Sequence, residues 1–297
     1  MVAGLSIRVP GWEKMKGNGA LGGWAFVTGA SAGIGRELAA AFAARGHDLI
    51  LTARNEEALA ALARDLIARH AVKAKTMPAD LSLPGAGEAI AEALAEAGLA
   101  IEILVNNAGV ACEGDFARIS LDDGLRLLQV NVVALTSLTR LLLPPMLARG
   151  RGRILNLASI AGFMPVPRLA AYAASKAYVL SFTEALAEEL RGTGVTATAL
   201  CPGLTDTAMI RGSELGKPVP AAMIMSAKDV AEAGCAACLS GETVCVPGFA
   251  NRVVTSGAPL LPRALVRAIG GAVTGGGWDW VASALRAGGL ADGRSVR

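Results

Sequence analysis

Aromatic side chains are scarce in this sequence, making up 4% of its 297 residues, and only two of them are tyrosines. Hydrophobic residues nevertheless reach 53%, and alanine and glycine are abundant. A chain of this length can bury a sizeable core, either as one large domain or as two smaller ones. The excess of small side chains predicts that the helices around this core pack closely.

Cysteine and histidine are also few. The five cysteines do not form a framework typical of secreted, disulfide-rich proteins. Cys235 and Cys238 have the Cys-x-x-Cys spacing of a redox or zinc pair, but they lie in the alanine-rich helical run AEAGCAACL. The only histidines, His47 and His70, are distant from them in sequence. We therefore predict that the pair is buried in the core, and no metal site is expected.

Strong charge and long apolar runs are missing as well. The formal net charge is +3 and the basic residues are scattered, which does not favour nucleic-acid binding. No uncharged stretch approaches the roughly 20 apolar residues of a membrane-spanning helix, so no span is expected. Residues 1–22 mix Glu13, Lys14 and Lys16 with glycines and lack a signal-peptide core. They are predicted to be a flexible extension of a cytoplasmic protein.

What the sequence does contain is a regular alternation of short apolar runs and longer amphipathic stretches. This alternation is typical of a parallel α/β sheet with helices on both faces. It predicts a single doubly wound, Rossmann-like catalytic domain over residues 23–248 with about seven strands. The strands and their exit loops are expected at 24–29, 48–53, 72–80, 101–109, 153–159, 195–203 and 243–248.

Two segments break the alternation. Residues 204–226 follow the sixth strand without a clear period, and an insertion at this end of a strand lies where such sheets bind ligands. Residues 249–297 form a helical extension, in which 259–273 is predicted to be a short amphipathic helix with Arg263 and Arg267 four positions apart. This helix has the pattern of a membrane-surface helix, but docking on a partner helix or on its own core is favoured.

A glycine-rich turn, TGASAGIG at 28–35, connects the first strand to the first helix. Gly29 suits a tight turn, Gly33 lets the backbone approach a phosphate, and Gly35 lets helix and strand pack closely. The amino terminus of the helix then favours a pyrophosphate. A purely structural turn is the alternative, but the position between strand and helix favours a dinucleotide site.

The end of the second strand bears on the choice between NAD and NADP. An NAD site usually has an acidic residue about 20 residues after the glycines, where it binds the ribose hydroxyls. Here the sequence reads Thr52-Ala53-Arg54-Asn55, without an acid. Arg54 can bind a 2′-phosphate with two hydrogen bonds. A solvated surface arginine is the alternative, and the residues favour NADP(H) over NAD(H).

Tyr172 and Lys176 stand one helical turn apart in the run YAASK, thirteen residues after Ser159. A phenol has an ordinary pKa of about 10, too high for acid–base chemistry near neutral pH. A lysine on the same helix face is expected to lower that pKa by favouring the phenolate. The other tyrosine, Tyr178, lacks a lysine in this position.

Taken together, these motifs resemble those of the short-chain dehydrogenase/reductase family, from Thr28 to Thr207 in family order. The resemblance implies the catalytic positions Asn131, Ser159, Tyr172 and Lys176. It also implies a cofactor site made of Gly29, Ser31, Gly33, Ile34, Gly35, Arg54, Asp80, Leu81, Asn107, Ala108, Gly109, Tyr172, Lys176, Pro202, Gly203, Thr205 and Thr207. It does not extend to residues 1–22 and is weak beyond about residue 246.

The activity implied by the resemblance is hydride transfer between a carbonyl and a secondary alcohol. Tyr172 would be the general acid and base, Ser159 would polarise the substrate oxygen, and Lys176 would also hold the nicotinamide ribose. Asn131, in a distorted helical turn, would hold a water that connects Lys176 to solvent. Family members are mostly dimers or tetramers packed through the helices that contain Asn131 and Tyr172, so a homodimer or homotetramer is expected.

Two rival functions share this fold. A dinucleotide sensor or scaffold without turnover is expected to have lost catalytic residues, and an epimerase or dehydratase usually has a larger carboxyl-terminal domain. Neither feature is present. The substrate is less defined: Met209, Ile210, Met223 and Met225 either line an apolar pocket or pack the insertion onto the sheet. A hydrophobic small molecule is a weak preference.

Overall fold

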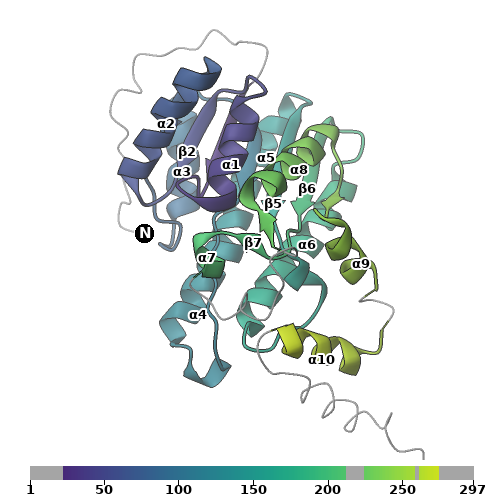
Figure 1. Ribbon diagram of the computed structural model, residues 1–297. Helices are drawn as coiled ribbons and strands as arrows, with labels where there is room; N and C mark the ends of the chain where they lie inside the picture. Colours follow the sequence, from purple (N-terminus) through teal and green to yellow (C-terminus); the bar gives the residue numbers. More distant parts are fainter. Residues whose placement is uncertain (1–22, 212–223, 258–260, 274–297) are drawn as a thin grey trace, which may run out of the picture.

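The computed structural model of the chain describes residues 23–211, 224–257 and 261–273 (Figure 1). The predicted flexible extension 1–22 and the end of the chain after residue 273 lie outside the described residues. So does the central part of the insertion, residues 212–223, which includes Met223.

The predicted doubly wound sheet is present as seven parallel strands in the order β3-β2-β1-β4-β5-β6-β9. All seven predicted strands occur in it, mostly shorter than their sequence windows because these windows included the exit loops. The strand order reverses direction between β1 and β4, which is the point where such sheets bind ligands. The strands are β1 (Trp24–Thr28), β2 (Leu49–Thr52), β3 (Ala74–Thr76), β4 (Ile101–Asn106), β5 (Gly152–Leu157), β6 (Val195–Leu200) and β9 (Val244–Cys245).

Helices cover both faces of this sheet. On one face lie α1 (Gly33–Ala43), α2 (Glu56–His70) and α8 (Ala227–Ser240), and on the other α3 (Ala86–Glu96), α5 (Leu135–Ala148) and α6 (Ala170–Glu189). Successive strand residues point to opposite faces. In β1, Ala25 and Val27 join the first core cluster and Phe26 joins the second. Burial on both faces explains why the strands read as nearly continuous apolar runs.

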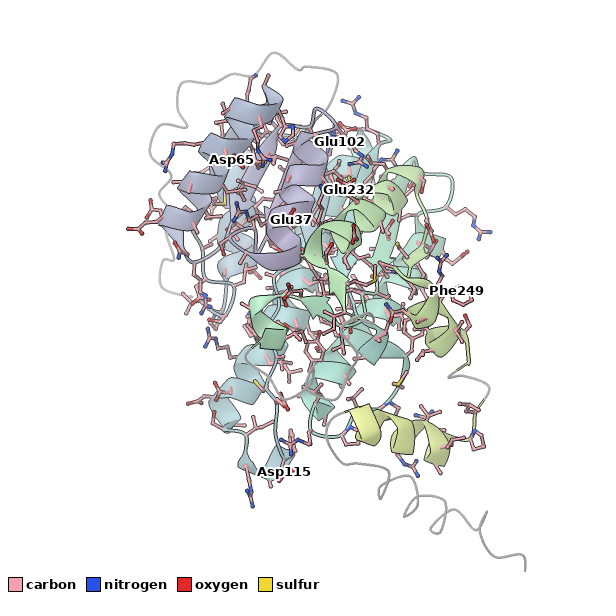
Figure 2. The ribbon with its side chains drawn as sticks, viewed as in Figure 1. Glu37, Asp65, Glu102, Asp115, Glu232 and Phe249 are labelled. Atoms are coloured by element: carbon pink, nitrogen blue, oxygen red, sulfur yellow. The ribbon has the colours of Figure 1, made fainter. Side chains whose placement is uncertain are left out.

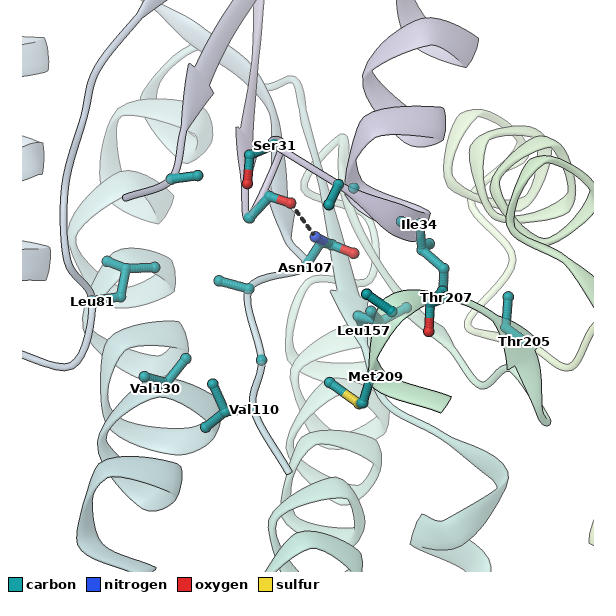
Figure 3. Close-up of a pocket in the computed structure, with 18 of the residues that line it drawn as sticks. Ser31, Ile34, Leu81, Asn107, Val110, Val130, Leu157, Thr205, Thr207 and Met209 are labelled. Atoms are coloured by element: carbon teal, nitrogen blue, oxygen red, sulfur yellow. Dashed lines mark hydrogen bonds between the residues drawn. The ribbon is translucent and has the colours of Figure 1, made fainter. Parts of the chain in front are cut away.

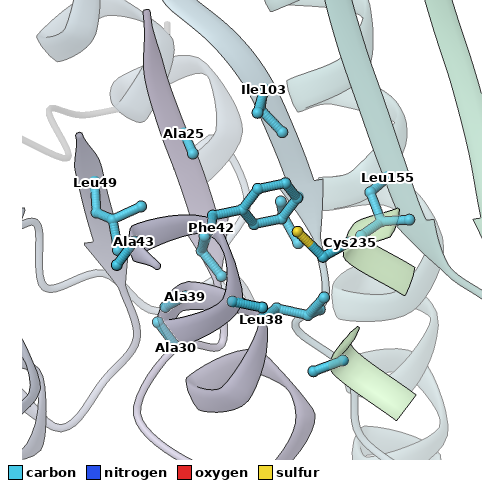
Figure 4. Close-up of a cluster of buried hydrophobic side chains, with 14 of the residues drawn as sticks. Ala25, Ala30, Leu38, Ala39, Phe42, Ala43, Leu49, Ile103, Leu155 and Cys235 are labelled. Atoms are coloured by element: carbon cyan, nitrogen blue, oxygen red, sulfur yellow. The ribbon is translucent and has the colours of Figure 1, made fainter. Parts of the chain in front are cut away.

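Small side chains allow the helices to lie close to the sheet, as their abundance predicts. Phe42 of α1 fills the space between Ala25, Ile103 and Cys235 (Figure 4). Cys235 and Cys238 of α8 are completely buried, so the Cys-x-x-Cys pair belongs to the core as predicted. Burial raises the pKa of both thiols to about 12, which keeps them in the unreactive thiol form.

A chain of buried polar side chains crosses the second face of the sheet. The Asn106 amide donates hydrogen bonds to Thr139 of α5 (3.0 Å) and to Asn156 of β5 (2.9 Å). The Asn156 amide donates in turn to Thr183 of α6 (3.0 Å). Buried polar groups need such partners, so this polar chain fixes how α5 and α6 sit on β4 and β5.

The two irregular segments contain more structure than their sequences predict. The insertion begins and ends with short paired strands, β7 (Thr205–Asp206) and β8 (Met225–Ser226), and contains helix α7 (Ala208–Arg211). The extension forms α9 (Phe249–Gly257) and α10 (Arg263–Val273). Both helices lie within the predicted helical extension 249–297, and α10 falls within its 259–273 segment.

One helical run bears on the expectation of no membrane span. Residues Leu121–Ala148, which comprise α4 (Leu121–Leu128), a π-helical segment and α5, are long and apolar enough to cross a membrane by length and composition. Of its most apolar window, 44% is buried inside the protein. Core helices of soluble proteins meet the same criterion.

Candidate active site

A cavity of about 710 Å³ opens at the carboxyl ends of the strands (Figure 3). The loops after β1, β2, β4, β5 and β6 all contribute to its lining. Every site residue predicted from the sequence lines this cavity except Asn131. Residues from 29 to 210 in the sequence therefore meet in one space of a size that suits an extended ligand.

The glycine-rich turn has the geometry that its sequence predicts. Gly29 and Gly33 have positive φ angles of +64° and +55°, which side chains disfavour. A Cβ on Gly35 would lie 2.3 Å from the carbonyl oxygen of Gly29, so only glycine fits there. Helix α1 begins at Gly33 without a side-chain cap and without an acidic residue in its first turn. Its free N–H groups form an anion site that suits a pyrophosphate.

Hydrogen bonds of Asn107 and Thr28 hold the glycine-rich turn in place, a role that the sequence did not predict for either residue. The Asn107 side chain donates to the carbonyl oxygens of Thr28 (2.8 Å) and Gly29 (3.3 Å). The second of these bonds is the dashed line in Figure 3. The Thr28 hydroxyl accepts from the N–H groups of Asn107 and Ala108, both at 2.9 Å. Asn107 thus shapes the cavity through its amide. Thr28 was recognised only as the start of the motif.

The far end of the cavity is lined by Arg54, Asp80 and Leu81, together with Arg126 of α4. Burial acts to raise the pKa of Asp80, but two hydrogen bonds from Ser82 and the charges of Arg54 and Arg126 lower it overall. The carboxylate is therefore ionised and available as an acceptor. Arg126 was not predicted, because nothing in its local sequence distinguishes it from a solvated helix residue.

Ser159 and Tyr172 meet at the other end of the cavity. The Ser159 side chain caps the turn Ile160–Phe163 by accepting from the Ala161 N–H (3.1 Å), so it has a structural role as well. Burial raises the pKa of Tyr172, and a hydrogen bond with Ser159 partly opposes this rise. The phenol is therefore protonated near neutral pH.

Lys176 follows one turn later on α6 and is 4% exposed. Its ammonium donates to the carbonyl oxygen of Leu157 (2.6 Å) and lies 5.7 Å from the centre of the Tyr172 ring. Burial lowers the pKa of Lys176 to about 8. The sequence predicted that this lysine lowers the pKa of Tyr172, but here burial dominates and that pKa is raised.

Asn131 lies behind the cavity wall, in the π-helical segment Gln129–Ala134. Its side-chain oxygen accepts from the Val110 N–H (2.9 Å), and its amide nitrogen donates to the Val110 carbonyl and to the Ser175 hydroxyl, both at 3.0 Å. These bonds use both amide hydrogens and one of the two acceptor positions of the side-chain oxygen. The predicted distorted helical turn is present as the π-helical segment.

The loop after β6 borders Ser159. The Pro202 carbonyl accepts from the Ile160 N–H (3.0 Å), and the Thr205 hydroxyl donates to the Gly203 carbonyl (3.0 Å). Asn251 of α9 lies directly against Gly203, where a Cβ would come within 2.4 Å of its side-chain oxygen. Nothing in the sequence connects Asn251 with this loop, which lies almost 50 positions earlier.

The wall near Tyr172 is apolar. Val166, Leu169 and Ala173 form a buried cluster, against which Tyr172 and Ile210 pack. Met209 and Ile210 line the cavity, as one of the two predicted alternatives requires. Met225 follows the other alternative, since it packs against the core cluster around α1 and α8.

These residues suit a nicotinamide dinucleotide, whose pyrophosphate, adenosine and nicotinamide ends need different surroundings. The turn with Gly29 and Gly33 leaves room where side chains would block a phosphate. The cavity then extends from Arg54 and Asp80 at one end to Tyr172 at the other. Such a combination, at the reversal of a parallel sheet, defines the class of dinucleotide-binding oxidoreductases.

Comparison with known proteins gives the same result. The family model described as short chain dehydrogenase matches residues 23–217. The very-long-chain 3-oxoacyl-CoA reductase of Rattus norvegicus is 36% identical over 213 residues, which cover 70% of this chain and 68% of the rat protein. The chain thus belongs to the short-chain dehydrogenase/reductase family. It is an NAD(P)-dependent oxidoreductase that interconverts carbonyl and alcohol groups.

Two solved structures cover almost the whole chain. A short-chain dehydrogenase from Sphingobium yanoikuyae in complex with NADPH is 31% identical with a TM-score of 0.69, covering 93% of this chain and 98% of that one. The bulky-bulky ketone specific alcohol dehydrogenase from Comamonas testosteroni is 27% identical with a TM-score of 0.68, covering 93% and 96%. Both alignments extend well beyond residue 217, so these two relatives have counterparts of much of the chain outside the family match.

Proposed function

We propose that Tyr172 and Ser159 perform the proton chemistry of this enzyme at the apolar end of the cavity. The observation that carries the proposal is that Ser159, Tyr172 and Lys176 line the same end of a cavity that suits a dinucleotide. The nicotinamide, when bound, supplies or accepts the hydride. Ser159 donates to the substrate oxygen as negative charge develops on it. Tyr172, which burial keeps protonated, gives its proton to the same oxygen during reduction and takes it back during oxidation.

Lys176 supports this reaction from within the helix. Its ammonium lies close to the Tyr172 ring, and a pKa of about 8 lets it gain or lose a proton near neutral pH. It holds the nicotinamide ribose and resupplies the proton of Tyr172. Asn131 contributes by fixing Val110 and Ser175, which keeps the π-helical segment against α6 and leaves its backbone to hold the relay water.

The cofactor of this proposal is NADP(H). Arg54 is exposed at the adenosine end of the cavity, where the chain has no acidic residue between 52 and 55. Arg126 lines the same end and adds a second positive charge. A 2′-phosphate gains charge-assisted hydrogen bonds from such a pair, whereas the free hydroxyl of NAD does not. The NADPH complex of the Sphingobium yanoikuyae relative supports the same choice.

The substrate of this proposal is a bulky apolar ketone or the corresponding secondary alcohol. Met209 and Ile210 give the cavity an apolar wall, and Tyr172 and Ile210 pack against the buried cluster of Val166, Leu169 and Ala173. Burying apolar substrate surface against such a wall contributes about 25 cal/mol per Å². The names of two relatives, a very-long-chain 3-oxoacyl-CoA reductase and a bulky-bulky ketone specific alcohol dehydrogenase, refer to ketones of this kind.

A cofactor-oxidation screen tests the proposal. NADPH and NADH are offered with long-chain 3-oxoacyl thioesters, bulky aryl ketones and short polar ketones, and the loss of absorbance of the reduced nicotinamide is followed. We expect turnover of bulky apolar ketones with NADPH. Tyr172→Phe is expected to lower kcat by at least about 10²-fold while the Kd for NADPH stays within about twofold, because general acid catalysis contributes on that scale. Wild-type turnover in this variant would show that Tyr172 is not the acid.

We also propose that the enzyme is a cytoplasmic homodimer or homotetramer. Large apolar side chains are exposed along α4, the π-helical segment, α5 and α6, and self-association would bury them. They are Leu121, Leu125, Leu128, Val133, Leu141, Leu147 and Tyr178. The five cysteines are all free thiols, in keeping with a reducing compartment. Mass measurement of Leu125→Glu against the wild type tests the assembly, and a monomeric wild type would contradict it.

A further inference from the structure

Positive charge is concentrated at the carboxyl-terminal end of this protein. Residues 249–297 contain six arginines and two aspartates, which leaves 22 basic and 23 acidic residues in the rest of the chain. Within the described part, Arg252, Arg263 and Arg267 are exposed, and neither α9 nor α10 contains an acidic residue. The described helices α9 and α10 therefore present exposed arginines on a protein whose sequence before residue 249 is almost neutral.

Helix α9 is inverted relative to an ordinary surface helix. Its polar residues Asn251 and Thr255 point inward, and Thr255 is only 4% exposed. Its large apolar residues point outward: Phe249 is 78% exposed, Val253 56% and Val254 41%. Figure 2 shows Phe249 at the outer margin of the molecule. Phe249 and Val253 are one turn apart, so they share a face of the helix.

Helix α10 connects this surface with the substrate end of the cavity. A Cβ on Gly270 would lie 2.3 Å from the Pro165 carbonyl oxygen, so α10 lies directly on the segment that carries Val166 and Leu169. Leu261, just before α10, is 38% exposed. Figure 1 shows α9 and α10 on the side of the molecule opposite α2.

We propose that α9 and α10 attach the enzyme to the surface of an anionic lipid membrane. Outward apolar side chains and arginines, on two helices that contain no acidic residue, fit the boundary between acyl chains and negatively charged headgroups. The exposed apolar face of α4 differs, because Asp122 and Asp123 lie on the same helix and would be repelled by such a membrane. That face suits another copy of the chain, whereas the surface of α9 and α10 suits lipid.

This attachment goes beyond the proposed reaction and does not depend on it. It would bring the substrate end of the cavity, near Tyr172 and Ile210, close to the layer in which bulky apolar ketones dissolve. Helices that lie on a membrane in this way bind reversibly, and each basic residue near an anionic surface contributes about 1 kcal/mol, or roughly fivefold in affinity. The binding should weaken as salt screens the charges.

Vesicle flotation with the full-length protein tests the proposal. Vesicles of phosphatidylcholine with about one third phosphatidylglycerol are compared with vesicles of phosphatidylcholine alone, at low and at high salt. We expect the protein to float with the anionic vesicles at low salt and to remain largely behind with the neutral ones. Failure to float with anionic vesicles would overturn the proposal.

Two double variants separate the contributions. Arg263→Gln with Arg267→Gln should weaken binding to anionic vesicles by roughly twentyfold, and Phe249→Ser with Val253→Ser should abolish the binding that persists at high salt. The matched control is Arg64→Gln with Ile67→Ser on α2, which removes an exposed arginine and an apolar residue that is 45% exposed. NADPH binding without vesicles checks that each variant folds.

Two outcomes of these measurements would contradict the proposal. An equal loss of vesicle binding in the α2 control would show that the attraction is not specific to α9 and α10, which overturns the proposal. If Phe249→Ser with Val253→Ser lowers the oligomeric mass of a protein that does not bind vesicles, the surface is an interface between copies of the chain. That result would overturn it as well. Activity plays no part in these outcomes, so they are independent of the reaction.

Discussion

Burial of the Lys176 ammonium should make the stability of this protein depend on pH in a defined window. The side chain is 4% exposed, and burial lowers its pKa from 10.5 to about 8. The difference corresponds to about 3 kcal/mol at 1.36 kcal/mol per pKa unit. This free energy destabilises the folded protein whenever Lys176 is protonated.

The sign of the effect follows from the two protonation states. Below about pH 8 the lysine is protonated in both the folded and the unfolded chain, so the full cost is present. Between about 8 and 10.5 the folded form loses the proton while the unfolded form keeps it. Stability rises with pH wherever the unfolded state binds more protons, so the cost is relieved across this window.

Lys176→Met tests this reasoning, because methionine keeps an unbranched stem and removes the charge. The free energy of unfolding of the wild type, minus that of the variant, should increase by about 3 kcal/mol between pH 7 and pH 10.5. Urea unfolding followed by circular dichroism measures it, and groups that titrate in both proteins cancel in the difference. Lys228→Met, at an exposed position of α8, is the control and should show little change with pH. A difference that is the same at both pH values would refute the argument.

Three further substitutions test other parts of the site. Arg54→Asp should lower the ratio of kcat/KM for NADPH over that for NADH by at least about tenfold, because it removes a charge-assisted hydrogen bond to the 2′-phosphate. An unchanged ratio would exclude this role of Arg54. Asn251→Ala should raise the Kd for NADPH about fivefold, because the contact that holds Gly203 is lost. Binding of adenosine 2′,5′-bisphosphate should be unchanged, since that fragment lacks the nicotinamide. Equal effects on both ligands would indicate a general loosening of the site. Gly35→Ala should lower the free energy of unfolding in urea by about 1–3 kcal/mol, because its Cβ would clash with Gly29. In the control Gly124→Ala the Cβ would meet no atom within 4 Å, so the change should be neutral or stabilising by up to about 1 kcal/mol. Similar values for both variants would contradict the contact with Gly29.

The sequence was sufficient for the fold and for the composition of the cavity, because both depend on local patterns. Apolar runs of strand length determined the seven strands, and the loops after parallel strands necessarily meet at one edge of the sheet. Motif residues such as Gly29, Ser159 and Pro202 therefore converge although they are far apart in the chain.

The features that could not be predicted depend on contacts between distant segments. Arg126 and Asn251 look like ordinary helix residues, and only the folded chain places them beside Asp80 and Gly203. The pKa of Tyr172 was predicted in the wrong direction, because the neighbouring lysine was visible in the sequence and the depth of burial was not. The outward apolar face of α9 was missed for the same reason.

The polar chain from Asn106 through Asn156 to Thr183 has a consequence for how the substrate specificity of this enzyme can evolve. It holds α6, and with it Tyr172 and Lys176, in a fixed register against the sheet. Met209 and Ile210, which line the cavity, belong to α7 of the insertion and lie outside that polar chain. Mutations there can reshape the space for a ketone without moving the proton donor, so new specificities are open to selection or to engineering while the chemistry stays constant.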